Sequence, residues 1–399
     1  MTTTVPTRAA QDDLRVSRDP ITTPTEWRDG KRLLWLSALC IPATPFAAWG
    51  LVSLTGLGAF WWFGPVFVFV LLPLLDLVVG YDRANPPEEL RAQLEADHFY
   101  RWATYAYLPA QLAGLVFACR QWSSGGLSWV DHLGLAVTTG IVAGVAINTA
   151  HELGHKREDL ERWLAKLALA QSGYGHFSLE HNRGHHVRVA TPEDPASSRY
   201  GEGFYAFLPR SVVGGVRSAV HLEQARLSRK GLRFLSLRNE LLVVWSMTVV
   251  LFGALAAVFG LGVLPWLALQ AVLGFSLLEV VNYLEHYGLL RRAQANGAYE
   301  RVRPEHSWNS DTTVSNLFLY QLQRHSDHHA NAGRRYQVLR SMAEAPQLPA
   351  GYAPMMLLAY APPLWRRVMD PRLAAHYGGD LSRANIAPRL QGRVAATGR

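Results

Sequence analysis

The sequence is poor in cysteine. It has two, Cys40 and Cys119, among 399 residues, and no Cys-x-x-Cys pair. A thiolate zinc site, an attached haem and an iron–sulfur cluster are therefore disfavoured, and no disulfide framework is implied. The first 30 residues are polar and contain no apolar core, so we expect no cleavable targeting peptide.

Charge is also scarce, at 18% of residues, against about 25% in soluble domains. It is missing from residues 33–80, where Asp76 is the only charged side chain, and from 241–278, which has none. Apolar runs of this length cross a bilayer as helices. The number of such runs disfavours the alternative, buried helices of a soluble protein. We predict six spans, at about 33–57, 58–80, 101–119, 127–149, 241–259 and 263–284.

The positive charges predict how these spans are oriented. Of 39 lysines and arginines, only Arg120 clearly falls in a loop that joins an odd to an even span. Positive charge marks the cytoplasmic side of a membrane. We therefore expect both termini inside and an all-α, six-helix bundle covered by a cytoplasmic helical cap. The expected divisions are a polar segment 1–30, a membrane domain 31–380 with its cap at 150–240 and 285–370, and a polar tail 381–399.

Four histidine clusters lie at or just beyond the cytoplasmic ends of the predicted spans. Histidine is the commonest metal ligand among side chains, and imidazoles with some carboxylates suit iron, with zinc and copper also possible. Nine imidazoles are more than one ion needs. The clustered residues are His151, His155, His181, His185, His186, His286, His325, His328 and His329.

Spacing within the clusters predicts shared helix faces. His151 and His155 are four residues apart, so they face the same side of a helix. His181 and His185 repeat this spacing, which would turn His186 to one side. The last cluster has i, i+3 and i+4 spacing, again one face. His286 stands alone at the end of the sixth span.

Carboxylates and amides accompany every cluster. We expect them to fix the ring tautomers, because a ligand imidazole usually donates its other N–H to such a group. The alternative is ordinary solvated surface. An ionisable group inside a span is a functional candidate by default. These residues are Glu152, Glu180, Asn182, Glu279, Asn282, Glu285 and Asp327.

The first cluster also fits another chemistry. Residues 151–155 read His-Glu-Leu-Gly-His, the pattern of zinc proteases in which the glutamate is the base. That interpretation uses two histidines and one further ligand, and it leaves the other clusters without a role.

The clusters with their flanks resemble the membrane alkane hydroxylases, within the fatty-acid desaturase and hydroxylase superfamily. The resemblance extends from about residue 30 to about residue 380. The block 282–289, Asn-Tyr-Leu-Glu-His-Tyr-Gly-Leu, is the one that separates alkane hydroxylases from desaturases. The other matching blocks are 148–156, 175–186, 189–196, 306–310 and 322–330.

The resemblance implies a non-haem di-iron monooxygenase of the bacterial inner membrane. The nine clustered histidines would hold two iron ions, cycling between Fe2+ and Fe3+, with no haem and no bound flavin. O2 and electrons from rubredoxin, fed by its reductase, would convert the terminal carbon of n-alkanes drawn from lipid into primary alcohols. The 399 residues contain only two cysteines, too few for the iron site of a fused rubredoxin domain. We expect contacts with membrane lipids and no nucleic-acid partner.

Other activities stay open. One is a hydroxylase or desaturase of the same superfamily that acts on another apolar chain. A non-catalytic metal-binding membrane protein is a further alternative. For the alkane, we expect a tunnel whose walls include Trp61, Trp62, Val68 and Leu72, although these residues could equally face lipid or pack between helices. For an acidic rubredoxin, we expect a docking surface at Lys156, Arg157, Arg183, Arg188 and Arg199, which are equally consistent with ordinary positive-inside charge.

Overall fold

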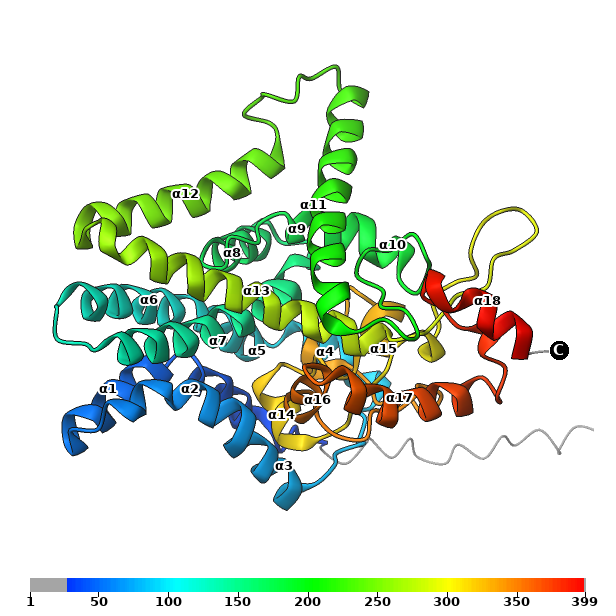
Figure 1. Ribbon diagram of the computed structural model, residues 1–399, viewed down its shortest axis with the longest axis horizontal. Coiled ribbons are helices and arrows are strands. Elements are labelled where there is room, and N and C mark those ends of the chain that lie inside the picture. Colours follow the sequence, from blue (N-terminus) through cyan, green and yellow to red (C-terminus); the bar gives the residue numbers. More distant parts are fainter. Residues whose placement is uncertain (1–26, 398–399) are drawn as a thin grey trace, which may run out of the picture.

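The computed structural model describes residues 27–397 and is built from helices (Figure 1). Over this range the only extended pairings are four isolated bridges, such as Tyr81 with Thr312. The prediction of an all-α protein is confirmed for the described residues. Residues 1–26, most of the predicted polar N-terminal segment, lie outside them.

The first apolar region, residues 32–79, is helical but irregular. Its elements are η1 (Arg32–Cys40), α1 (Thr44–Thr55), η2 (Gly58–Trp62), α2 (Phe63–Val66), the π-helical η3 (Phe67–Leu71) and α3 (Leu72–Val79). The axes of η1 and α1 are bent by 61°. The π turn ends just before Pro73, which has no N–H to donate to the preceding turn, and a widened turn is one way to accommodate that loss.

Within residues 27–397, four helices are long and apolar enough to cross a membrane, or five if the bent pair η1 and α1 is one span. The four are Gly58–Val79, α7 (Trp129–Gly154), α12 (Glu240–Phe259) and Leu261–His286, which joins η6 (Leu261–Val263) to α13 (Leu264–His286). The predicted span at 101–119 falls on α5 (His98–Tyr105) and α6 (Tyr107–Ser123). In Figure 1, α6, α7, α12 and α13 lie next to one another as a bundle.

Close contact between α7 and α13 depends on small residues. A Cβ added at Gly140 would lie 2.8 Å from Cβ of Leu273, and one at Gly274 would lie 2.9 Å from Cβ of Ala143. Gly144 is equally close to α13. Small residues four apart let helices approach closely in membranes. The two helices that end in His151 and His286 are therefore packed backbone against backbone.

The remaining elements follow the C-terminal ends of α7 and α13, and most lie in the right half of Figure 1. Those after α7 are α8 (Asp159–Ala170), α9 (Phe177–Glu180), the π-helical η5 (His181–His185), α10 (His186–Arg188) and α11 (Phe204–Arg229). Those after α13 are η7 (Pro304–His306), α14 (Thr313–Phe318), α15 (His325–Ala330), η8 (Tyr336–Val338), α16 (Tyr352–Ala359), α17 (Pro362–His376), η9 (Leu381–Arg383) and α18 (Pro388–Thr397). Two more, η4 (Glu88–Leu90) and α4 (Arg91–Ala96), precede α5.

Buried polar contacts hold α14 and α15 in place. The carboxylate of Asp76, near the end of α3, accepts the N–H groups of Val314 (2.8 Å) and Ser315 (3.0 Å) at the start of α14. An acceptor here satisfies donors that a helix N-terminus leaves free. The buried guanidinium of Arg324 donates to the carbonyls of Asp82 (2.9 Å) and Leu339 (2.7 Å). These contacts fix the histidine-bearing α15 relative to the end of α3.

Candidate metal centre

The structure brings all nine clustered histidines together in two groups. In each group, the ring nitrogens that would bind an ion all lie within 4.8 Å of one another. The five-histidine group contains His151, His155, His181, His186 and His328. The four-histidine group contains His185, His286, His325 and His329.

The second cluster does not follow the predicted spacing. His181 and His186 share a group, with their Nε2 atoms 3.0 Å apart, while His185 belongs to the other group. The reason is that residues 181–185 form a π turn instead of an α turn, and a π turn brings residues five apart together. Gly184 leaves room for the pair formed by Glu180 and Arg188, because a Cβ here would lie 2.4 Å from Oε1 of Glu180 and 2.6 Å from Nη2 of Arg188.

The last cluster is also divided between the groups. On α15, Nε2 of His328 lies 3.1 Å from Nε2 of His186, whereas Nε2 of His329 lies 2.8 Å from Nε2 of His325. His286, at the end of α13, completes the four-histidine group, with Nε2 3.3 Å from that of His325. The three rings of α15 do lie together as the spacing predicts, with centroids 4.4 to 5.8 Å apart, but the face they share supplies both groups.

The ring nitrogens fit a metal centre. Nε2 atoms of His151, His155 and His185 are buried and have no hydrogen-bond partner, and other Nε2 atoms face one another. Burial, and then the neighbouring rings, hold the pKa of His155, His181 and His328 well below 6.5. Neutral imidazoles offer a lone pair to a cation. Two groups of converging, unprotonated nitrogens are what two metal ions need.

Asp194 is the functional residue that the sequence analysis missed. Its Oδ2 lies 2.9 Å from Nδ1 of His185 and also accepts a hydrogen bond from Ser197 (2.6 Å). Burial acts to raise the pKa of Asp194, but His185 and Ser197 outweigh it and hold the pKa at about 2. An ionised carboxylate on the outer ring nitrogen orients a ligand histidine. The sequence signal that could have identified Asp194 is its place between Pro192 and Pro195, within the block 189–196 that resembles the family.

Glu285 stands on the inner side of the four-histidine group. Its Oε2 lies 3.2 Å from Nε2 of His325, the nitrogen turned toward His286 and His329. Its Oε1 accepts a hydrogen bond from the hydroxyl of Tyr352 (2.7 Å). Glu285 therefore faces the position of an ion, whereas a group that fixes a tautomer would face the outer nitrogen.

The other predicted acidic partners contact cations instead of rings. Glu152 pairs with Lys156 (2.9 Å), Asp327 with Arg334 (3.0 Å) and Glu180 with Arg188 (3.0 Å). Asn182 donates to the carbonyl of Ser178 (3.0 Å). Glu279 and Asn282 line a small pocket next to His181 and His185. The pairing of Glu152 with a lysine also argues against its role as the base of a zinc protease.

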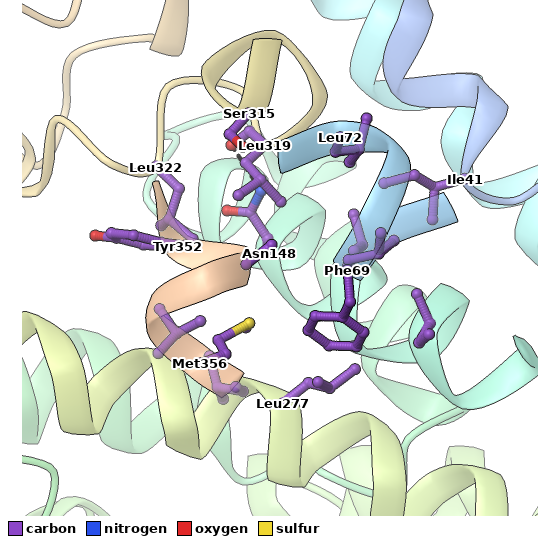
Figure 2. Close-up of a pocket in the computed structure, with 17 residues that line it drawn as sticks. Ile41, Phe69, Leu72, Asn148, Leu277, Ser315, Leu319, Leu322, Tyr352 and Met356 are labelled. Carbon is purple, nitrogen blue, oxygen red and sulfur yellow. Dashed lines mark hydrogen bonds between the residues drawn. The ribbon is translucent and has the colours of Figure 1, made fainter. Parts of the chain in front are cut away.

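An apolar cavity with about 670 Å³ of empty space lies beside the four-histidine group. Figure 2 shows Phe69, Leu72 and Leu277 among its apolar walls, and Asn148 and Tyr352 among its few polar ones. The hydroxyl of Tyr352 points out of the cavity to Glu285. One wall residue of the cavity is thus a single hydrogen bond from the carboxylate at the metal centre.

The predicted tunnel residues divide into two pairs. Val68 and Leu72 line this cavity. Trp61 and Trp62 do not, because they lie in η2, before the π turn that carries the chain past the cavity. Trp61 is buried in a cluster with Ala48, and the ring of Trp62 covers Gly134.

The predicted docking residues are also unequal. Lys156 is buried and Arg188 is engaged by Glu180 and by Ser218 (2.6 Å). Arg183 pairs with Glu240 (3.1 Å) and lines an open polar pocket. Arg157 is exposed and Arg199 is partly buried.

Comparison with known proteins agrees with this geometry. The profile of the fatty acid desaturase family matches residues 127–359, a range that contains α7, α13 and all nine histidines. A helical protein with apolar spans and a histidine-rich, non-haem metal site is the class that fold and site define, and this chain belongs to the fatty acid desaturase family.

Its relatives narrow the class. The chain is 45% identical over 379 residues to the alkane 1-monooxygenase of Acinetobacter baylyi, covering 92% of this chain and 91% of that protein. It is 46% identical over 366 residues to an alkane 1-monooxygenase of Pseudomonas putida, covering 92% and 91%. The xylene/toluene monooxygenase hydroxylase component of Pseudomonas putida is 27% identical over 320 residues, covering 77% and 81%.

Proposed function

We propose that this protein is an alkane 1-monooxygenase, which uses O2 to convert the terminal carbon of an n-alkane into a primary alcohol. The observation that carries the proposal is an apolar cavity whose wall residue Tyr352 donates a hydrogen bond to Glu285, the carboxylate that faces the four-histidine group. An unactivated C–H bond is beyond the chemistry of side chains, so a metal must supply the oxidation. Identity of about 45% over nine-tenths of the chain to proteins with this name supports the same activity.

The metal is proposed to be iron, with one ion in each histidine group. The nine histidines would be the ligands, and Asp194 would orient His185. Two bound irons, cycling between Fe2+ and Fe3+, would supply the reaction of O2 with the alkane. Imidazole and carboxylate donors suit this metal, and the described residues place no thiolate at the centre.

The side chains of the cavity bind the alkane and exclude water. An n-alkane has no polar group to recognise, so its chain must be selected by the shape of apolar walls such as Val68, Leu72 and Leu277. Asn148 donates one hydrogen bond to the carbonyl of Leu319 (2.7 Å), which satisfies part of the polar surface of this wall. Tyr352 holds Glu285 through its hydroxyl and keeps this carboxylate next to His325.

We propose six spans, with both termini and the metal centre on the cytoplasmic side of the inner membrane. The bent pair η1–α1 and the shorter α6 would be the two spans beyond the four found by length and composition. The distribution of lysine and arginine supports this orientation. A single membrane domain over residues 31–380 follows from it.

The proposed electron donor is rubredoxin, supplied by its reductase. The family resemblance suggests this partner, and the exposed Arg157 and the polar pocket at Arg183 lie next to His155 of the five-histidine group. Electrostatic docking of an acidic donor weakens with ionic strength. Turnover with rubredoxin should therefore fall as salt is raised, and salt-insensitive turnover would exclude this surface.

The direct test feeds purified protein in lipid, with rubredoxin and its reductase, a mixture of n-alkanes and separately xylene. We expect primary alcohols from the alkanes by gas chromatography and two irons per chain by metal analysis. Hydroxylated xylene alone would favour the activity named for the more distant relative. One zinc per chain and no oxygenated product would exclude the proposal.

A further inference from the structure

A second, much smaller pocket lies beside the histidine rings, with room for about one water molecule. Its walls include two of the clustered rings, His181 and His185, and four polar side chains, Tyr174, Ser211, Glu279 and Asn282. The apolar cavity, by contrast, is lined almost entirely by hydrocarbon.

Helix α13 separates the two spaces. Leu277 and Val281 face the apolar cavity, whereas Glu279 and Asn282 face the polar pocket. Residues four apart share a helix face, and a shift of two residues turns to the opposite side. One helix therefore presents hydrocarbon to one space and hydrogen-bonding groups to the other, and it ends in His286 of the four-histidine group.

The polar pocket contains an unsatisfied carboxylate oxygen. The Glu279 side chain lies in an apolar helix and is 3% exposed. Its Oε1 accepts the hydroxyl of Tyr174 (2.6 Å), while Oε2 is buried without a well-formed hydrogen bond, close to the side chains of Ser211 and Asn282. Buried polar atoms are nearly always hydrogen-bonded, and ordered water fills the role where the protein does not.

The other titratable groups around the pocket either have a charged partner or keep a fixed protonation state. Burial lowers the pKa of His176 to about 4, so its ring is neutral. Burial, and then Glu279, hold the pKa of Tyr174 well above 10, so its hydroxyl keeps its proton and donates. Glu180 is paired with Arg188, and His185 with Asp194. Glu279 is the one carboxylate facing the pocket that has neither a cation nor a histidine as its partner among the described residues.

We infer that this pocket holds ordered water and delivers protons to the metal centre, with Glu279 as the residue that positions this water and relays its protons. The inference rests on the proposed function. Conversion of RH and O2 into ROH and H2O consumes two electrons, which the donor supplies, and two protons. The apolar cavity cannot carry those protons, since a charge in hydrocarbon is far too costly. A wet polar pocket in contact with two ligand rings gives them a separate route.

The first test is independent of turnover. An experimental density map of the iron-loaded protein in lipid should show ordered water within hydrogen-bond distance of Oε2 of Glu279. A dry pocket would overturn the inference even if the protein proves to be an alkane hydroxylase.

The second test replaces Glu279→Gln, which keeps size and hydrogen bonding but cannot relay a proton. We expect two irons per chain as before, alcohol formation lower by about 100-fold, less alcohol per donor oxidised, and a larger solvent isotope effect in D2O. A merely structural role would not change the isotope effect.

Glu161→Gln is the matched control. Glu161 is equally buried and also accepts a tyrosine hydroxyl, from Tyr105 (2.8 Å), but it pairs with Arg335 away from the pocket. This variant should lower stability without altering the isotope effect. An unchanged isotope effect and normal coupling in Glu279→Gln would overturn the inference, whereas a wild-type protein that makes no alcohol would instead defeat the proposed function.

A variant that fills the pocket distinguishes the role of the water from the role of the Glu279 carboxylate. Gly215 lines the pocket, and a Cβ there would lie 3.9 Å from Nε2 of His176, an ordinary contact. Gly215→Ala should behave like the wild type, whereas Gly215→Val should displace water and reproduce the loss of coupling with Glu279 intact. Normal coupling in a folded, iron-loaded Gly215→Val protein would also overturn the inference.

Discussion

The two histidine groups of the metal centre differ in their surroundings. The five-histidine group is built from imidazoles alone, and the carboxylates adjacent to its histidines in sequence pair with cations: Glu152 with Lys156, Glu180 with Arg188 and Asp327 with Arg334. The four-histidine group has one imidazole fewer, but Glu285 faces it from inside and Asp194 orients His185 from outside. Carboxylates thus lie where imidazoles are fewer, so ions held at the two positions would have different donors.

The largest expected effect comes from removing one ring from each group. His286→Ala leaves three histidines in the four-histidine group, so this ion should be lost and iron should fall from two per chain toward one. His155→Ala leaves four histidines in the other group, which should keep most of its ion. Metal analysis and Mössbauer spectra measure both. Equal losses in the two variants would remove the distinction between the groups.

Glu285→Gln tests whether the inner carboxylate helps to bind an ion. We expect iron affinity at one of the two positions to fall by about 10- to 100-fold, the range found when groups that support a metal site are changed. Tyr352→Phe should cause a smaller loss, because it removes only the hydrogen bond that holds Glu285. Glu152→Gln is the control, since that carboxylate bonds no ring. A larger loss of iron in the control would contradict the assignment.

Asp194→Asn should weaken the same position by about tenfold, because a neutral amide orients His185 less strongly than an ionised carboxylate. Iron titration followed by spectroscopy would measure the change. Asp327→Asn serves as the comparison, since Asp327 is also buried but bonds Arg334. Identical iron affinity in the two variants would show that Asp194 is structural only.

The smallest effect on the centre itself is expected from the cavity wall. Val68→Trp fills part of the apolar cavity and should shift product formation toward shorter alkanes while both irons stay bound. Trp62→Phe should leave the chain-length profile unchanged, because Trp62 lies outside the cavity. Gas chromatography of the products measures both. An unchanged profile in Val68→Trp would remove Val68 from the substrate site.

Hydropathy and local spacing were enough to predict the helical class and the meeting of the histidines. Long uncharged runs produce apolar helices whatever their neighbours do, and clusters at the ends of such helices on one side can meet. Hydropathy was less informative about α6, which has only 17 residues. A short helix with polar residues gives a weak signal even where it packs within the bundle.

The assignment of each histidine to a group could not be predicted from sequence. His185 and His186 separate because residues 181–185 adopt a π turn, and a turn with one extra residue depends on packing around Gly184. The partner of His185 is nine residues away and reaches it only through the fold. The pairing of Glu152 with Lys156 instead of a ring likewise depends on the burial of both side chains.

Two pairs of sequence neighbours are divided between the groups: His185 from His186, and His328 from His329. Consecutive α-carbons are about 3.8 Å apart, so the separation of the two ion positions is restrained twice by the length of a single peptide unit. With an ion in each group, each pair of neighbouring histidines would link the two ion positions through one peptide unit. A change that moves the histidines of one group would therefore also move ligands of the other.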